Sequence, residues 1–313
     1  MRIIGFPGQT EEQLGRTVAT IGVFDGVHTG HRLLLSEVVK SARRQKAKAV
    51  VITFDPHPQA VLGMVDNPVK LLSSLPERLA EFETIGIDVA IVCRFTRELS
   101  LLTAEQFLVE LMSRFGIREF ILGPNHTFGY KRSGNRDTLP AIAKALDISI
   151  GWIEPNLIEG RTVSSSWIRS LLYEGELEQA NNLLGSPYHL SGIVVAGDQR
   201  GRQLGFPTAN IQIESTEKLI PCDGVYFAQT VDETGVVRPT LLSIGTRPTF
   251  GALPRAIEAF ILDFNGDLYG RKIHLNLLKF CRPQLTFTSA EELIGKMNDD
   301  LAQARVYFQK VSK

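Results

Sequence analysis

The sequence predicts an α/β protein of two domains, in which a parallel sheet covered by helices is followed by a small antiparallel barrel. Up to about residue 185, short apolar runs alternate with amphipathic stretches of helical length, which is typical of a parallel sheet with helices on both faces. Beyond that point several strand-like runs follow one another closely with turn signals between them, as in hairpins that close a barrel. A length of 313 residues fits two domains of ordinary size.

The first domain is expected to alternate strands and helices along the chain. Near-continuous apolar runs predict buried strands at 17–23, 49–54, 89–94 and 119–122. Apolar residues at three- and four-residue spacing predict helices at 32–46, 75–85 and 103–115. Because ligands of such sheets bind beyond the carboxyl ends of the strands, the segments that follow the strands are where a site is expected.

The change of pattern falls at Gly185-Ser186-Pro187, so we expect domains at 1–185 and 186–313. In the second domain, strands are expected at 191–196, 224–231, 239–244, 256–264 and 272–280. A terminal helix is expected from about 290 to 310, where apolar residues recur at helical spacing.

Charge and cysteine content exclude several classes of protein. Lys+Arg and Asp+Glu balance at 34 each, without the basic surplus of proteins that hold nucleic acid by its phosphates. The three cysteines lie far apart, which argues against a disulfide framework and a four-cysteine zinc site. The first residues hold no long apolar run and are not expected to be a signal peptide, and no apolar stretch approaches the ~18 residues of a membrane helix. We therefore expect a soluble, cytoplasmic protein without nucleic-acid or membrane partners, whose oligomeric state no sequence feature indicates.

The strongest local signal is GVFDGVHTGH at 22–31, between the first expected strand and the first helix. His28 and His31, at the start of that helix, can both donate hydrogen bonds to one polyphosphate, and the free N–H groups of the first turn favour the same anion. Gly26 and Gly30 let the backbone come close to such a ligand. The alternative, a glycine-rich turn with two exposed histidines, is less favoured because a strand precedes the motif and a helix follows it.

This string resembles the nucleotidyltransferase signature G-x-F-D-G-x-H-x-G-H of bacterial bifunctional riboflavin kinase/FMN adenylyltransferases, also called FAD synthetases. FDPHP at 54–58, GPNHTFG at 123–129 and VSSSWIR at 163–169 resemble further elements of that family in the same order. The resemblance implies a Rossmann-like domain in which the FMN phosphate attacks the α-phosphorus of ATP and pyrophosphate leaves. Because that phosphate is already mostly ionised, with a second pKa near ~6, no general base is needed. His28, His31, Arg169 and Mg²⁺ would align the groups and neutralise charge.

The resemblance also implies which other side chains line the first site. Contacts to ATP or its phosphates are expected from Gly22, Phe24, Asp25, Gly30, Asn125, Ser164, Ser165 and Ser166. The flavin side is expected at His57, Pro58 and Phe128. One of the three serine hydroxyls is expected to cap the helix that follows. Two residues depart from the family pattern, His126 in place of an aromatic residue and Arg78 in place of a common lysine, and we expect them to alter flavin or nucleotide affinity.

GRQLGFPTAN at 201–210 resembles the riboflavin kinase signature G-R-x-L-G-F-P-T-A-N. Glycine-rich backbone can wrap phosphates, so ATP contacts are expected from Gly201, Arg202, Gly205 and Thr208. Thr208 and Asn210 are two residues apart, so on an extended strand their oxygens point to one side and suit Mg²⁺.

A carboxylate in the string IEAFILDF at 257–264 is the expected base of the kinase. Glu258 alternates with apolar neighbours, so it faces either solvent or an enclosed site, and a solvated surface charge is the commoner case. The resemblance maps Glu258 onto the base that takes the proton from the ribityl 5′-hydroxyl, since an alcohol, unlike a phosphate, gains from one. Asp263 is expected to be structural, and Arg282 to contact flavin or phosphate.

The sequence thus predicts an enzyme that phosphorylates riboflavin to FMN and adenylylates FMN to FAD, with ATP and Mg²⁺. One rival is a nucleotidyltransferase for another phosphorylated acceptor, such as a cytidylyl or pantetheine-phosphate transferase, and the kinase signature argues against it. Another is a flavin-binding regulator that has lost its catalytic residues. The intact His28, His31, Thr208, Asn210 and Glu258 argue against that alternative.

Overall fold

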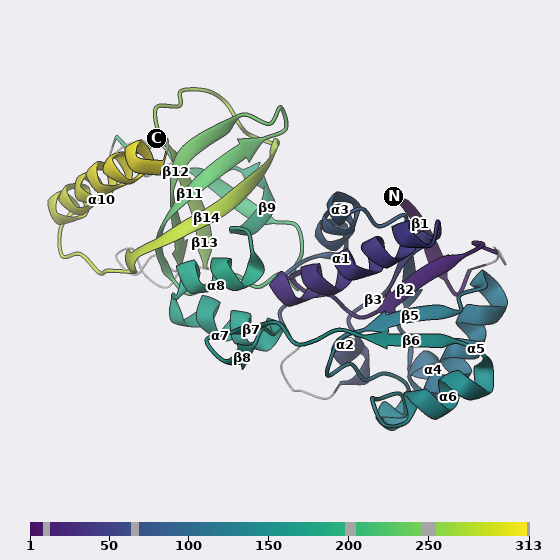
Figure 1. Ribbon diagram of the computed structural model, residues 1–313. Coiled ribbons are helices and arrows are strands. Elements are labelled where there is room, and N and C mark those ends of the chain that lie inside the picture. The colour runs from purple at the N-terminus through teal and green to yellow at the C-terminus, as the bar shows by residue number, and fades with distance from the viewer. Residues whose placement is uncertain (9–12, 64–68, 198–204, 246–254, 312–313) are drawn as a thin grey trace. The chain divides into compact units, whose positions relative to one another are not determined.

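The computed structural model describes residues 1–8, 13–63, 69–197, 205–245 and 255–311. The chain forms two compact units, Met1–Ser165 and Ser166–Lys313, each with its own sheet (Figure 1). Within the described ranges, no helix combines the length and the apolar character needed to cross a membrane.

The first unit is built on a six-stranded parallel sheet, as the sequence predicts. Its strands are β1 (Arg2–Phe6), β2 (Thr17–Ile21), β3 (Lys48–Asp55), β4 (Val89–Arg94), β5 (Glu119–Leu122) and β6 (Ser149–Trp152). The spatial order is β1-β4-β3-β2-β5-β6. From β2 the chain adds β3 and β4 on one side and later β5 and β6 on the other, so the direction of strand addition reverses between β2 and β5. That reversal is a topological switch point, where loops at the carboxyl ends diverge and leave room for a ligand.

Helices cover both faces of this sheet (Figure 1). Those with residues in the two cores are α1 (Thr29–Arg44) and α3 (Leu75–Ile85) on one face, and α5 (Ala104–Phe115) and α6 (Leu139–Leu146) on the other. In β3, Val51 packs in the core shared with α1, whereas Val50 and Ile52 pack in the core shared with α5. Both faces are apolar, which explains why the predicted strands read as continuous apolar runs.

Shorter elements connect these layers. They are α2 (Pro58–Leu62), α4 (Arg97–Ser100), the 3-10 turn η1 (Tyr130–Arg132) and the hairpin β7 (Leu157–Ile158) with β8 (Arg161–Thr162). The sequence analysis predicted none of them, and it also missed β1 and β6. Both missed strands lie at the edges of the sheet, where one side has no partner strand, and both are short with a glycine, Gly5 or Gly151, that interrupts the apolar run.

Helix boundaries follow from local capping. α3 begins and ends where predicted, because Ser74 and Glu77 form a capping box at its start and Gly86 closes it in the left-handed conformation. α1 begins three residues earlier than the predicted 32, because the His28 ring accepts a hydrogen bond from the His31 N–H and so acts as the N-cap. The helix therefore includes His31 itself.

The second unit contains a closed antiparallel barrel, again as predicted. In chain order its strands are β9 (Tyr188–Val195), β10 (Ala209–Ile213), β11 (Gly224–Asp232), β12 (Val237–Gly245), β13 (Ala256–Ile261) and β14 (Lys272–Pro283). Among its described residues the unit also has the helices α7 (Ser165–Glu174), α8 (Leu177–Leu184) and α10 (Ala290–Val311). α10 is the predicted terminal helix, and its Ala304 and Phe308 pack in one cluster with Phe227 and Leu262.

β13 is shorter than the predicted 256–264. The chain leaves the barrel after Ile261, and Asp263 adopts a positive φ of 54°. Its carboxylate pairs with the Arg305 guanidinium of α10 at 2.6 Å. Asp263 therefore has the structural environment that the sequence analysis expected.

Candidate functional site

The first candidate site lies beyond the carboxyl end of β2, at the switch point of the sheet. Residues 22–28 form the loop between β2 and α1, and the Gly22 N–H donates to the carbonyl of Ile52 at 2.9 Å. At Gly22 and Gly30 a side chain has little room: a Cβ would lie 2.9 Å from the Phe24 ring and 3.3 Å from the His28 ring, respectively. Both glycines thus allow the two rings to pack against the backbone.

The two signature histidines form a stacked pair. Their ring centroids are 3.6 Å apart and the ring planes differ by 16°. The Nδ1 of His28 accepts the His31 N–H at 3.3 Å, so in the neutral ring the proton lies on Nε2, which is then a donor. The Nδ1 of His31 is buried and has no hydrogen-bond partner among the described residues. His31 therefore keeps hydrogen-bonding capacity that no described residue uses.

A third histidine, His126, shares this environment. Burial lowers the pKa of His28 to about 4, against the opposing charge of Asp25, and lowers the pKa of His126 to about 4 as well. Burial, together with His28 and His126, holds the pKa of His31 well below its usual range. The Nε2 of His126 is also buried without a partner in the described part of the chain. At neutral pH the three imidazoles are uncharged hydrogen-bonding groups.

Acidification is expected to destabilise this unit because of these histidines. An unfolded chain protonates histidine near pH 6.5, whereas folded His28 and His126 do so only near 4, so between these values the unfolded state binds more protons. Stability is retained above about pH 6.5, and each histidine accounts for a loss of about 2 kcal/mol by pH 5. Urea unfolding at pH 7.5 and 5 measures this, and His126→Phe should reduce the difference. An unchanged pH dependence in that variant would contradict the prediction.

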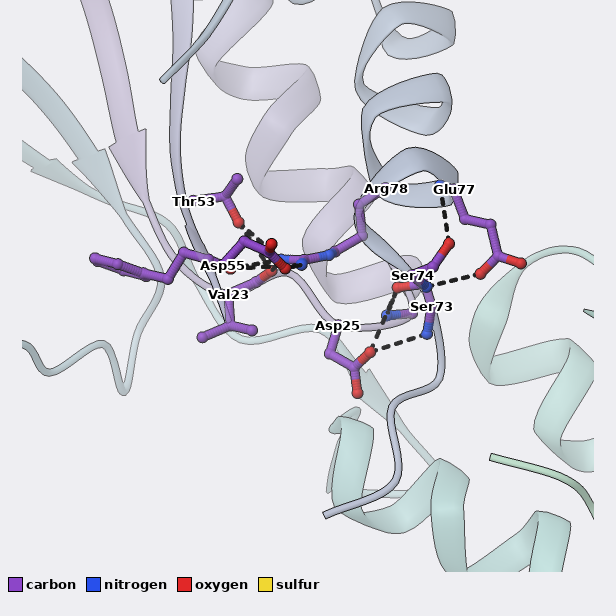
Figure 2. Close-up of polar contacts among 10 residues, drawn as sticks. Val23, Asp25, Thr53, Asp55, Ser73, Ser74, Glu77 and Arg78 are labelled. Atoms are coloured by element: carbon purple, nitrogen blue, oxygen red, sulfur yellow. Dashed lines mark hydrogen bonds and ion pairs between the residues drawn. The ribbon is translucent and has the colours of Figure 1, made fainter. Parts of the chain in front are cut away.

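Asp25 fixes the loop from inside. Asp25 is 4% exposed, and its carboxylate accepts the N–H group of Leu72 at 3.1 Å. It also accepts the N–H group of Ser73 at 3.0 Å (Figure 2). The Ser165 hydroxyl donates to the backbone carbonyl of Asp25 at 2.9 Å. Phe24 is buried too, packed edge-on against Phe82 of α3. These contacts favour a structural role for the side chains of Asp25 and Phe24, and direct contact with ATP remains a prediction for them.

The remaining predicted residues of the first site are spread over several segments. Asn125 is exposed in the segment after β5, and Phe128 packs near Phe107 and His126. His57 caps α2, because its Nδ1 accepts the Gln59 N–H at 3.1 Å, and Pro58 is the first residue of that helix. Ser164 is half-buried and Ser166 is exposed. Arg169 lies on α7 in the second compact unit.

The second candidate site lies on strands β10 and β13 of the barrel. Asn210 is paired directly with Glu258 across these strands, and directly opposed residues of an antiparallel pair share a face. A Cβ at Gly197 would lie 2.1 Å from the amide nitrogen of Asn210, so this glycine makes room for the side chain. Phe206 packs against Phe260 with ring centroids 5.7 Å apart. This contact holds the segment that leads to Thr208 against β13.

Other residues predicted for the kinase site lie outside the Asn210–Glu258 strand pair. Thr208 is half-buried just before β10, and Gly205 has a φ of 85°, whereas Gly201 and Arg202 lie outside the described residues. The guanidinium of Arg282 binds the buried carboxylate of Asp300 on α10, with nitrogen-to-oxygen distances of 2.6 to 3.1 Å. This pairing favours a structural role for Arg282, and its flavin contact remains a prediction.

Sequence reasoning noticed Arg78 only as a departure from a pattern, and it missed Ser73. Figure 2 shows Arg78 reaching from α3 toward Val23, Thr53 and Asp55, with Ser73 beside Asp25. No sequence motif marks Ser73, because its contact is with Gly26, a loop residue 47 positions away in the chain. The signal for Arg78 was a charged residue on the buried face of a predicted helix, a position that demands partners.

Mg²⁺ fits the residues of the second site. Asn210 and Thr208 offer neutral oxygens, and the Glu258 carboxylate lies opposite Asn210. Hard oxygen donors of this kind suit a small cation that takes its remaining ligands from phosphate and water. The part of the chain that the structure describes holds no cluster of three or more His, Cys, Asp or Glu side chains suited to a metal ion, so a cage built from the protein alone is not formed there.

Comparison with known proteins finds a different family profile in each part of the chain. A family profile described as FAD synthetase matches residues 10–167, and one described as riboflavin kinase matches residues 184–308. A bifunctional riboflavin kinase/FMN adenylyltransferase of Listeria monocytogenes is 35% identical, over 94% of this chain and 93% of its own length. The enzyme of the same name from Bacillus subtilis is 33% identical, over 97% and 96%.

A solved structure has the same fold over almost the whole length. It is a crystal structure named a macrolide-efflux protein from Streptococcus pneumoniae, 27% identical, with a TM-score of 0.85, and the match covers 96% of this chain and 99% of that one. The expected fold class is thus confirmed, and so is the expected family. By its two matched profiles and its near full-length relatives, the chain belongs to the bifunctional riboflavin kinase/FMN adenylyltransferase family.

Proposed function

We propose that residues 1–185 adenylylate FMN and residues 186–313 phosphorylate riboflavin, so that the chain converts riboflavin to FMN and then to FAD. The observation that carries this proposal is that each half brings its own signature residues together. His28 and His31 stack at the start of α1, and Asn210 faces Glu258 across β10 and β13. Support comes from the family profiles, FAD synthetase at residues 10–167 and riboflavin kinase at residues 184–308.

Adenylyl transfer requires alignment and charge neutralisation rather than a base. The FMN phosphate is ionised at neutral pH, so its oxygen can attack without losing a proton to the protein. The neutral imidazoles of His28 and His31 donate hydrogen bonds to phosphate oxygens of ATP, and the N-terminus of α1 adds its free N–H groups. Asn125, the three serines at 164–166 and Arg169 are proposed as further phosphate ligands, with His57, Pro58 and Phe128 on the flavin side.

Phosphorylation of riboflavin requires a base, because the attacking group is an alcohol. Glu258 takes the proton of the ribityl 5′-hydroxyl as its oxygen attacks the γ-phosphorus of ATP, and ADP leaves. Gly205 is proposed as a contact to the phosphates, and the ATP contacts predicted for Gly201 and Arg202 concern residues outside the described ranges. Thr208 and Asn210 would hold Mg²⁺, which would supply positive charge to neutralise the transferring phosphate.

A direct test of the whole proposal is product analysis. Riboflavin supplied with ATP and Mg²⁺ should yield FMN first and FAD afterwards, as followed by fluorescence and chromatography. If FMN accumulates and no FAD forms, the first site acts on another acceptor. If neither product forms, the chain is a flavin-binding protein without these activities.

Fragments of the chain should show where the kinase part begins. α8 belongs with the barrel: the Asn181 amide donates to Leu277 at 2.9 Å and accepts the Tyr188 N–H at 2.7 Å. We expect fragments 166–313 and 186–313 both to phosphorylate riboflavin and neither to make FAD. The longer one should be more stable by at least about 2 kcal/mol, because α8 buries several apolar side chains. A folded 166–313 fragment that lacks kinase activity would overturn the assignment of the barrel.

We further propose that the protein works in the reducing cytoplasm on small-molecule substrates. Cys93, Cys222 and Cys281 are free thiols, which suits that compartment. The charge balance and the absence of a basic surplus support small-molecule rather than nucleic-acid partners.

A further inference from the structure

The loop between β2 and α1 has a strained backbone. Three of its residues, Phe24, Gly26 and Val27, have positive φ angles of 56°, 80° and 38°. For Phe24 and Val27 this left-handed conformation is unfavourable, and it persists only where surrounding contacts impose it. The shape of the loop that carries the signature motif is thus imposed by its neighbours.

One set of restraints comes from the segment that leads into α3. The Asp25 carboxylate accepts two backbone N–H groups, from Leu72 and Ser73, and the Ser73 hydroxyl accepts the Gly26 N–H at 2.7 Å. Two consecutive residues of the strained loop are therefore bound to two consecutive residues of this segment. The capping box of Ser74 and Glu77 then fixes the segment to the first turn of α3.

The other restraint is Arg78, one turn further along α3. Its side chain is 1% exposed, and Nη1 donates to the Val23 carbonyl at 2.7 Å, the Thr53 hydroxyl at 3.0 Å and the Phe54 carbonyl at 3.3 Å. Nη2 donates to the Phe54 carbonyl at 3.4 Å and lies 3.6 Å from the Asp55 carboxylate. One buried guanidinium thus joins the start of the loop after β2 to the end of β3 (Figure 2).

The two chain segments that Arg78 joins continue into residues proposed to bind different substrates. The segment after Val23 continues into His28 and His31, proposed above to bind ATP, and the segment after Asp55 continues into His57 and Pro58, proposed to bind flavin. A rigid connection between them fixes the separation of the two binding loops. Since adenylyl transfer needs the FMN phosphate in line with the α-phosphorus of ATP, that separation affects the reaction itself.

We propose that Arg78 is a positioning residue for adenylyl transfer, which holds the ATP loop and the flavin loop in register without contacting either substrate. The inference rests on the function proposed for these loops. A planar guanidinium suits the task because its donors reach both carbonyls and the hydroxyl at once. An ammonium at the same place would keep the charge and only part of these hydrogen bonds.

The test uses the full-length protein with Arg78→Met and Arg78→Lys. A displacement of about 1 Å between reacting groups costs about 10² in rate, so Met should lower kcat of FAD formation by about 10- to 100-fold. KM values for FMN and ATP should change less than kcat, because each loop still binds its own substrate. Lys should restore part of the loss, because it keeps the charge and some of the hydrogen bonds. Riboflavin phosphorylation by the same preparation should be unchanged, as should FAD formation by the control Arg43→Met, which removes an exposed arginine paired with Asp88.

Different outcomes separate the proposal from its alternatives. A normal kcat in folded Arg78→Met, or a raised KM for FMN alone, would overturn it, the second result by showing direct flavin binding. If Arg78→Met does not fold, the variant Thr53→Val tests the proposal instead. It removes the hydroxyl that accepts a hydrogen bond from Arg78 and donates one to the Val23 carbonyl at 3.1 Å, while the side chain keeps its shape. This variant should lower kcat without raising KM, and wild-type kinetics would overturn the proposal. Wild-type protein that makes no FAD would instead refute the proposed function.

Discussion

Replacing Glu258 by glutamine is expected to lower riboflavin phosphorylation by about 10²–10⁴, the range found for loss of a general base. Glutamine keeps the size of the side chain and its hydrogen-bonding reach, but it cannot accept the proton of the attacking hydroxyl. Glu258 lies opposite Asn210, so the carboxylate is on the face that holds the proposed Mg²⁺ ligands. The measurement is the initial rate of FMN formation at saturating riboflavin and ATP.

The second activity of the chain provides the control for this variant. FMN supplied directly should become FAD at the wild-type rate, because adenylyl transfer needs no base and uses the other half of the chain. Asp263→Asn is a matched carboxylate control on the same barrel, since Asp263 is exposed and paired with Arg305. A Glu258→Gln protein that keeps more than about a tenth of the kinase rate lies outside the general-base range and reduces Glu258 to a surface or positioning residue.

Replacing His28 or His31 by alanine is expected to lower FAD formation by about 10²–10³, the effect of losing one preorganised donor to a charged oxygen. The low pKa values of the buried rings favour hydrogen-bond donation from neutral imidazoles over proton transfer. The rate of FAD formation from supplied FMN measures the effect. Riboflavin phosphorylation should persist in both variants.

His28 requires a second substitution, because its ring also caps α1. Asparagine is a strong N-cap residue, so His28→Asn should restore the stability lost in His28→Ala while leaving FAD formation low. His274→Ala removes a histidine of the barrel, bonded to Ser191 at 2.8 Å, and should leave adenylyl transfer unchanged. Near-wild-type FAD formation by the His28/His31 double variant would exclude this site as the place of adenylyl transfer.

The sequence was most informative where local interactions decide the structure. α3 has the predicted boundaries because Ser74, Glu77 and Gly86 are cap residues whose effect depends only on near neighbours. The parallel sheet and the barrel followed from apolar periodicity, and the two signatures located both candidate sites. Edge strands β1 and β6 were missed because their pairing is one-sided and their pattern correspondingly weak.

For other residues, the environment of the side chain depends on partners that no local sequence pattern reveals. Asp25 looked like a ligand contact of the motif, yet its carboxylate is bound by backbone N–H groups of Leu72 and Ser73. Arg282 looked available to flavin or phosphate, yet Asp300 of α10 holds its guanidinium. A buried charged group must find partners wherever the fold supplies them, and both partners here lie far along the chain.

The amino-acid sequence by itself determined the two fold classes, the family and the residue types of each reaction, because periodicity, caps and signatures are local properties. Only the tertiary structure decided that His28 and His31 stack as neutral rings, that Glu258 faces Asn210, and that Arg78 joins two loops. These depend on strand register and on burial. Both arise only when segments distant in the sequence pack together and exclude water.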